Sequence, residues 1–421
     1  MQLNRKIRIA SMLAAPLLAA AAVLAQAGAA SAGSGGALYV SPDGMPSGQD
    51  SSCETAAYTT IQSAVNAAAS GGTVVVCPGV YHEQVVIIKP LSLTGKHATI
   101  DETGVRPSLI VPIPGLGPQR IYAAVVIGSS HVSVSGFTIQ HAKGEGILAA
   151  GLSAPLTNLA IQHNAVVHND LGGTVKNPKY FECKAHGPVP GDCGEGVHFI
   201  AVAFSTVGEN LISGNSGGIL FTDELGPTHN NLIEDNVVTG NAADCGITMP
   251  GHNPNALNSA GQPQPSVAGV YKNVIRGNVV TKNGLKGFGA GVLFANAAPG
   301  TASYDNLVTA NYIAGNGLSG VTMHAHTIAP GAFEDLSGND VIGNEIGTNN
   351  LLGDPLDSPA SPKDLKKTGI LVFSGGTPVS LKIAGNRISD NVIGIWLSKP
   401  VTATGLRAND FDRVKIHVSR H

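Results

Sequence analysis

The sequence predicts an all-β fold, a single solenoid of short parallel strands that follows an N-terminal export signal. Three observations predict it: a recurring asparagine spacing, a glycine in front of most apolar strands, and a composition rich in glycine and poor in charge. The 421 residues include 54 Gly and are 43% hydrophobic but only 13% charged, against roughly 25% charged residues in an average globular domain. Apolar content this high favours a folded chain over disorder.

Asparagines recur in triplets with a spacing of five residues. The segment NLIEDNVVTGN has them at 231, 236 and 241, and the spacing returns from Asn273, Asn306 and Asn339, with partial copies from 164, 210 and 386. Short apolar pairs separate the asparagines, so each copy is predicted to be two or three short strands joined by tight bends. Such a unit cannot bury its apolar side alone, and its copies must stack.

The asparagines are interpreted as structural residues. Parallel strands stack about 4.8 Å apart, so equivalent side chains of successive copies lie above one another. Asparagine tolerates the left-handed backbone of a sharp bend, and its amide can hydrogen bond along the stack. A column of asparagines is therefore expected to satisfy the polar groups of the bends.

Both ends of the solenoid have sequence signals of their own. In YTTIQSAVNAAASGG, the apolar residues Ile61, Ala64, Val65 and Ala68 share one helical face, with a threonine before the helix and two glycines after it. This short helix would cap the first coil, whose open strand edge is otherwise an aggregation hazard. Strand-like runs follow the helix, and the tail FDRVKIHVSRH is expected to form a final strand or cap.

Residues 60 to 101, TIQSAVNAAASGGTVVVCPGVYHEQVVIIKPLSLTGKHATID, resemble the opening of the right-handed parallel β-helix superfamily with the pectin-lyase-like fold. They are most similar to secreted NosD-type proteins, and with the later repeats the resemblance covers about residues 38 to 400. It implies a single-stranded right-handed parallel β-helix. It leaves the function open, because this fold hosts lyases, glycoside hydrolases, esterases, epimerases, tailspikes and non-catalytic surface proteins.

The motifs of several catalytic sub-families of this fold are absent from this sequence. GVYHE from Gly79 resembles the first motif of pectin methylesterases, but their later Gln-Asp and Asp-Phe motifs have no counterpart. Polygalacturonase-like hydrolases need paired aspartates around the scissile bond, and no such set appears. Pectate-lyase-like chemistry needs an acidic calcium site beside a basic residue, and the acidic pair Asp223-Glu224 has no basic residue at the matching strand ends.

A candidate site emerges when the strands are aligned on their leading glycines. The offset of a residue is its number of positions after the leading glycine of its strand. Residues at odd offsets are apolar and should face inward, so residues at even offsets should face outward. A carboxylate and imidazoles on one outer strip can act as general acid and base toward a sugar chain, or as ligands of a divalent metal. The alternative is a polar rim on a solvated face. The outward column at offset six holds Glu224, His252, Ala297 and His326.

Further candidate residues lie next to this column. His324 is at offset four, while Asp223 and Asn296 are at offset five and are expected in the bend. His198 in CGEGVHF would extend the strip. Trp396, at an outward offset of the last clear coil, is expected either to stack on a sugar ring or to cover the C-terminal edge.

Export is predicted from the N-terminus. Residues 1–32 combine a basic start, an Ala/Leu-rich run and a small-residue cleavage site, typical of a signal peptide, with an uncleaved anchor as the alternative. The mature domain would span residues 33–421, secreted or in the cell envelope, with no membrane segment.

Export permits disulfides. The cysteines closest in sequence would pair as Cys53 with Cys77 and Cys183 with Cys193, which leaves Cys245 without a partner. Other pairings stay open.

The leading functional hypothesis is an exported protein that binds extracellular polysaccharide along its outer face and acts on it as a lyase, hydrolase or epimerase. The alternatives are a non-catalytic cell-surface scaffold and a NosD-like accessory role in periplasmic metal handling. A formal charge of −3 does not indicate nucleic acid, which requires a basic face. A monomer is expected. The sequence identifies no metal or cofactor, and calcium is the divalent cation that lyase chemistry would require.

Overall fold

The structure is a computed structural model, and it describes residues 36–44, 50–113, 117–170, 194–287, 289–296, 298–325, 332–353 and 365–421. The predicted signal peptide, the Cys183 and Cys193 pair and His326 lie outside the described residues. Residues 33–421 form one compact unit.

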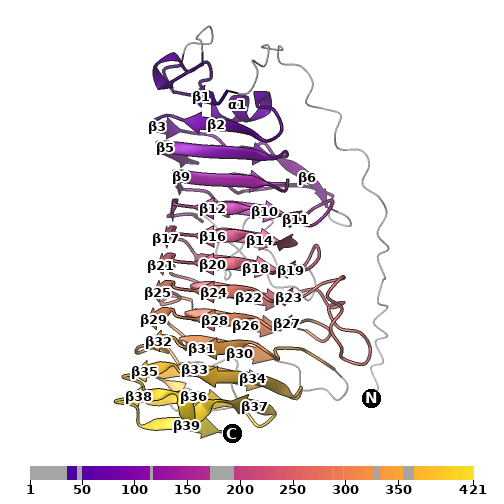
Figure 1. Ribbon diagram of the computed structural model, residues 1–421, viewed down its shortest axis with the longest axis vertical. Helices are drawn as coiled ribbons and strands as arrows, with labels where there is room; N and C mark the ends of the chain where they lie inside the picture. The colour runs from indigo at the N-terminus through magenta and orange to yellow at the C-terminus, as the bar shows by residue number, and fades with distance from the viewer. Residues whose placement is uncertain are drawn as a thin grey trace, which may run out of the picture. The chain divides into compact units, whose positions relative to one another are not determined.

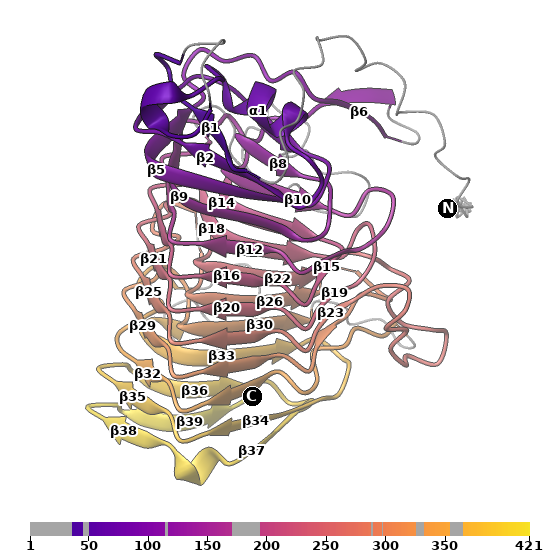
Figure 2. The same ribbon diagram turned by 45° about the horizontal axis from the view of Figure 1, so that its top comes forward.

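The chain winds into successive coils, each of which adds one strand to several parallel sheets (Figures 1 and 2). In one coil it passes from β18 (Gly217–Thr222) through β19 (Thr228–His229), β20 (Leu232–Glu234) and β21 (Val237–Thr239) to β22 (Ile247–Gly251). Strand β22 then pairs in parallel with β18. The all-β solenoid predicted from the repeats is therefore confirmed.

Four columns of strands run along the stack and are called sheets I to IV. Sheet I contains β4 (Val85–Ile87), β8 (Val125–Ile127), β10 (Ile147–Ala150), β14 (Glu195–Ile200), β18, β22, β26 (Val292–Asn296), β30 (Val321–Ala325), β33 (Thr368–Ser374), β36 (Ile393–Leu397) and β39 (Ile416–Arg420). Sheet II contains β12 (Ala160–Gln162), β16 (Thr206–Gly208), β20, β24 (Val274–Arg276), β28 (Leu307–Thr309), β31 (Asp340–Ile342), β34 (Val379–Ala384) and β37 (Val401–Thr404). Sheet III contains β13 (Ala165–Val167), β17 (Leu211–Ser213), β21, β25 (Val279–Thr281), β29 (Tyr312–Ala314), β32 (Glu345–Ile346), β35 (Arg387–Ser389) and β38 (Asp410–Asp412). The short sheet IV contains β11 (Leu156–Thr157), β15 (Val202–Ala203), β19, β23 (Val270–Tyr271) and β27 (Ser303–Tyr304).

The first coils differ from the later ones. The long strand β5 (Leu91–Asp101) pairs with β9 (Val132–Gln140), and β9 pairs with both β12 of sheet II and β13 of sheet III, so these two sheets begin as one. Strands β1 (Leu38–Val40), β2 (Gly72–Val76) and β3 (Gly79–Tyr81) precede them. An antiparallel hairpin of β6 (Ile110–Ile113) and β7 (Gly117–Arg120) leaves the stack, and the 3₁₀ turn η2 (Leu406–Ala408) follows β37.

The interior is apolar because alternate residues of each strand point inward. In β18, Ile219 and Phe221 are buried in the core, and Phe221 stacks on Phe199 of the preceding coil with ring centroids 4.9 Å apart. The register keeps like positions in line, so Ile247 of β22 pairs with Ile219 and with Val292. The inward face predicted from the glycine-led strands is confirmed.

The asparagines form buried ladders at the corners between sheets. The Asn278 Oδ1 atom accepts hydrogen bonds from Asn236 N (3.0 Å) and Asn236 Nδ2 (2.9 Å), and Asn278 Nδ2 donates to Asn311 Oδ1 (3.0 Å). One part of the prediction is wrong, because the left-handed residue directly precedes the asparagine of the predicted repeat at the bends of the described residues, except at Asn349. It is Asp235 at φ 54° before Asn236 and Gly277 at φ 69° before Asn278. The asparagine supplies the amide, and its neighbour supplies the turn.

The N-terminal cap is helix α1 (Ile61–Ala67), with Thr60 as the N-cap residue, as the sequence predicts. Its buried residues Ile61, Ala64 and Val65 pack into the core above the first coil. A disulfide joins Cys53, in the 3₁₀ turn η1 (Cys53–Thr55), to Cys77 after β2. The predicted Cys53 to Cys77 bond is therefore confirmed, while Cys245 is buried with a free thiol.

Replacing Cys53 and Cys77 together by serine is expected to loosen the cap. The bond closes a loop between residues 24 apart in sequence, and loop-closure entropy for such a loop corresponds to about 3 kcal/mol. Hydrogen exchange at the amides of α1 should accelerate accordingly. A reductant should accelerate exchange in the wild type but not in the double variant, and equal protection in both proteins would contradict the prediction.

Candidate active site on sheet I

The candidate residues gather where the strands of sheet I end. Asp223 and Glu224 directly follow β18, and His252 directly follows β22. Asn296 is the last residue of β26 and is the register partner of Gly251, next to His252. His324 lies in β30 as the partner of Ala295. Parallel stacking thus brings together residues that are 100 positions apart in sequence.

Glu224 and His252 form a hydrogen-bonded pair. The distance from His252 Nδ1 to Glu224 Oε1 is 2.6 Å, and the histidine side chain is only 2% exposed, against 27% for the glutamate. Burial acts to raise the pKa of the Glu224 carboxyl, but the charge and hydrogen bond of His252 outweigh it and lower the pKa to about 2. Glu224 is therefore an anion that fixes the imidazole through Nδ1, as a carboxylate partner does in many histidine sites.

Asp223 has a different role, because it attaches a loop. Its buried Oδ1 accepts hydrogen bonds from His252 N (2.7 Å) and Asn253 N (3.0 Å), and Oδ2 accepts one from Gly269 N (2.8 Å). One carboxylate thereby holds both ends of segment 252–269. Burial, together with the nearby charge of Glu224, raises the pKa of Asp223 to about 7 in spite of these hydrogen bonds.

The Asp223→Asn variant is expected to change the pH dependence of stability. The pKa of Asp223 is higher in the folded protein, about 7, than its ordinary value of 3.8, so the wild type loses stability as the pH rises between these values. The amide does not titrate, so the free energy of unfolding of the variant should rise relative to the wild type from about pH 4 to pH 7 and level off above it in urea denaturation. The exposed Asp235→Asn is the control, and parallel curves for Asp223→Asn and the wild type would contradict the assignment.

His198 belongs to a second pair that sequence reasoning did not identify. Its Nδ1 is 3.3 Å from Glu145 Oε1, and its Nε2 is 3.0 Å from Thr222 Oγ1, directly before Asp223. Glu145 is fully buried and also accepts a hydrogen bond from Glu195 N (2.8 Å). A signal for Glu145 was present, since Gly-Glu-Gly occurs at 144–146 and again at 194–196, and the structure stacks the two copies on adjacent coils.

Asn296 and Trp396 do not take part in the hydrogen bond between Glu224 and His252. Asn296 Nδ2 donates to Asp335 O (2.9 Å) and so ties β26 to the segment after residue 332. Trp396 is completely buried, and its ring stacks on that of His421 with centroids 5.0 Å apart. In this position the indole offers no open face to a sugar.

A solved structure shares this architecture. The A-module of the mannuronan C-5 epimerase AlgE6 from Azotobacter vinelandii aligns with a TM-score of 0.50 at 18% identity, over 86% of this chain and 90% of that chain. The chain is a right-handed parallel β-helix protein with the pectin-lyase-like fold. The fold expected from the resemblance of residues 60–101 is confirmed.

Further solved structures resemble the β-helix protein at lower scores. The AlgE4 A-module of mannuronan C-5 epimerase from Azotobacter vinelandii gives a TM-score of 0.47 at 16% identity, over 86% of this chain and 92% of that chain. Pectate lyase Pel9A gives 0.46 at 14% identity, over 89% of this chain and 78% of that chain. Identities this low concern the fold alone.

Sequence comparisons add one family. The family model described as periplasmic copper-binding protein (NosD) matches residues 127–327 of the β-helix protein, beyond the 60–101 stretch that carries the NosD-type resemblance. No curated protein sequence gives a significant match. Within the described ranges, no group of three or more His, Cys, Asp or Glu side chains could hold a metal ion, and no helix has the length and apolar character of a membrane span.

Proposed function

We propose that this β-helix protein is an exported enzyme that acts on extracellular polysaccharide by acid–base chemistry, with His252 as the proton-transfer group. The observation that carries the proposal is the 2.6 Å hydrogen bond between His252 Nδ1 and Glu224 Oε1 at the ends of neighbouring strands of sheet I. A histidine held by a carboxylate through one nitrogen has its other nitrogen directed for proton exchange. The Cys53–Cys77 disulfide supports export.

The chemistry follows from the charges of the pair. When His252 takes a proton through Nε2, the ionised Glu224 stabilises the imidazolium, as a buried carboxylate does beside a catalytic histidine. A lyase or an epimerase uses this step to remove a proton from a sugar ring carbon, and a hydrolase uses its reverse to protonate the glycosidic oxygen. Because His252 is 2% exposed, the substrate reaches it after the groups that cover the imidazole move aside, while Asp223 holds the backbone at His252 in place.

The test is a screen of the purified exported chain against neutral and acidic polysaccharides, with and without calcium. Release of unsaturated ends indicates a lyase, release of reducing ends a hydrolase, and altered sugar composition without cleavage an epimerase. Glu224→Gln should remove most of the activity. Binding without turnover in every case would favour the non-catalytic scaffold instead, and activity that is unchanged in Glu224→Gln would refute the assignment of this pair.

The family match favours a second function, an accessory role in copper handling. It rests on the NosD model over residues 127–327. The described residues do not fit a resident metal centre, because they assemble pairs such as His252 with Glu224 and no larger ligand group. Stoichiometric binding of copper by the purified protein, detected by calorimetry, would place this function above the enzymatic one.

A further inference from the structure

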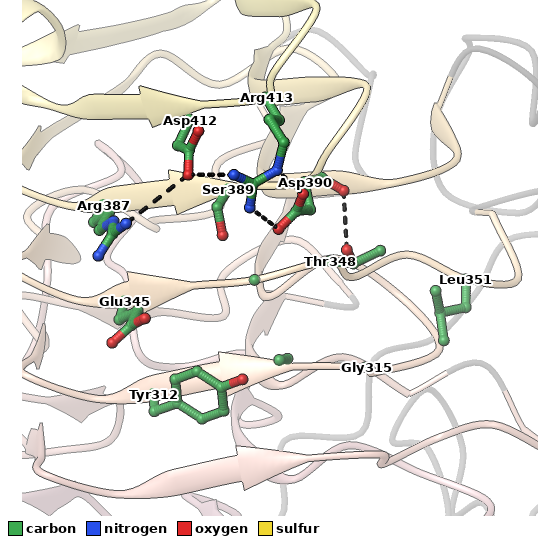
Figure 3. A pocket seen from close by; sticks show the side chains of 12 residues that line it. Tyr312, Gly315, Glu345, Thr348, Leu351, Arg387, Ser389, Asp390, Asp412 and Arg413 are labelled. Carbon is green, nitrogen blue, oxygen red and sulfur yellow. Dashed lines mark hydrogen bonds and ion pairs between the residues drawn. The ribbon is translucent and has the colours of Figure 1, made fainter.

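A hollow lies on sheet III (Figure 3), and none of the candidate active-site residues lines it. Its volume is about 520 Å³, and it is formed by β29, β32, β35 and β38. In both ribbon views these strands lie at the edge of the coils opposite to sheet IV, which continues from the strand ends that carry Glu224 and His252 (Figures 1 and 2). A volume in the range of roughly 300–1,000 Å³ is usual for ligand pockets.

Three coils place an aromatic ring, an acceptor and a donor in one outward column of the hollow. Tyr312 is the register partner of Glu345, and Glu345 is the register partner of Arg387. The backbones of neighbouring partners therefore lie about 4.8 Å apart along the stack. Tyr312 is 43% exposed. Arg387 Nη2 is 3.9 Å from Asp412 Oδ2, too far for a hydrogen bond. Both the ring and the guanidinium therefore remain open to a ligand.

The C-terminal rim of the hollow is held by hydrogen-bonded charges. Arg413 donates from Nε and Nη2 to the two carboxylate oxygens of Asp390, at 2.5 and 2.8 Å, and from Nη1 to Asp412 Oδ2 at 2.8 Å. Thr348 Oγ1 donates to Asp390 O at 2.9 Å. Exposed ion pairs contribute little to stability, but a bidentate pair fixes geometry. The rim is a formed wall on which a ligand can rest.

The charge of the hollow selects among ligands. Two arginines face three carboxylates, those of Glu345, Asp390 and Asp412, which gives a net charge of −1 and disfavours phosphate or polyuronate. A neutral sugar ring has an apolar face that fits an exposed tyrosine ring. Its hydroxyls both donate and accept, so they can donate to Glu345 and accept from Arg387.

An apolar stripe continues from the hollow along sheet III. The column above Tyr312 consists of exposed apolar side chains that are register partners in successive coils, namely Val279, Val237 and Leu211. A column of hydroxyls runs beside it, with Thr239 and Thr281 joined through their Oγ1 atoms at 2.9 Å. Apolar and hydroxyl rows side by side match the two faces of an extended sugar chain.

We infer that the hollow is a binding site for a neutral glycan. One sugar ring stacks on Tyr312, its hydroxyls bond to Glu345 and Arg387, and the following units lie along the stripe toward Leu211. This site is separate from the candidate active site, and it would bind the same or another polymer whether or not the protein catalyses a reaction.

Calorimetric titration of the purified exported chain tests this inference with cellohexaose, mannohexaose, maltohexaose and xylohexaose, and with hexagalacturonate as the acidic counterpart. At least one neutral probe should bind more tightly than hexagalacturonate. Tyr312→Ala should weaken that binding by at least about 10-fold, the loss typical of an aromatic anchor. Tyr312→Phe, which keeps the ring, should bind like the wild type. Each titration is repeated in a His252→Asn background, where the proposed reaction is slowed and consumes little of the probe.

The control is Phe204→Ala, which removes an exposed ring beside sheet IV and should leave binding unchanged. Tyr312 is a surface side chain, so unchanged circular dichroism and Tm should show that its variants fold. The inference is overturned if none of the neutral probes binds, if hexagalacturonate is preferred, or if Tyr312→Ala binds as tightly as Tyr312→Phe. These results do not depend on whether any polymer is cleaved.

Discussion

Replacing His252 by asparagine is expected to lower turnover of the polysaccharide substrate by about 10²–10⁴-fold, the usual contribution of a general acid or base. Asparagine can still donate a hydrogen bond to Glu224, so the local structure should persist while proton transfer is lost. The measurement is kcat and KM on the polymer that the screen identifies. A fall in kcat at nearly constant KM is expected, because the lost interaction belongs to the transition state.

The matched control is the surface pair of His163 and Glu209. His163 Nδ1 lies 3.4 Å from Glu209 Oε2, and both side chains are more than half exposed. His163→Asn removes a histidine from an equivalent carboxylate contact and should leave turnover unchanged. Glu224→Gln should also lower kcat, since the neutral amide no longer stabilises the imidazolium. Full activity of His252→Asn would contradict the proposed mechanism.

Replacing Asn278 by alanine is expected to destabilise the fold by about 3–5 kcal/mol, since each buried polar group left without a partner costs about 1–3 kcal/mol. Asn236 N and Nδ2 would both lose their acceptor, and the carbonyls of Ile233 and Arg276 would lose a donor at 3.0 Å. The shift of the urea denaturation midpoint measures the effect.

Asn278→Asp separates hydrogen bonding from packing, because the two side chains have nearly the same shape. The carboxylate would face Asn311 Oδ1, to which Nδ2 now donates, and buried acceptors that face one another repel. A larger loss than in Asn278→Ala is expected. Asn66→Ala, at an exposed position of α1, should change the midpoint little, and a similar small change in Asn278→Asp would show that the ladder does not stabilise the stack.

Sequence reasoning predicted the candidate pair but not its surroundings. The shared offset of Glu224 and His252 from their leading glycines predicted that they are neighbours, because the register of a parallel stack follows directly from the repeat. Sequence reasoning could not find Gly269, since the contact of Gly269 with Asp223 depends on how a long insertion returns to the coils, and it overlooked Glu145, whose only signal was the repeated Gly-Glu-Gly. Trp396 shows the same limit, as its outward offset did not reveal the stacking contact with His421.

The repeat determined the all-β architecture, the inward faces and the asparagine columns, and a separate amphipathic pattern determined the capping helix. Periodic residues can be satisfied together only when their coils stack in one direction, so the pattern leaves few alternatives. Only the tertiary structure decided which outward groups meet: the pairing of His198 with Glu145, the attachment of segment 252–269 by Asp223, and the hollow beside Tyr312. These contacts depend on the paths of unequal loops and on the side chains that cover each face, and neither is periodic in the sequence.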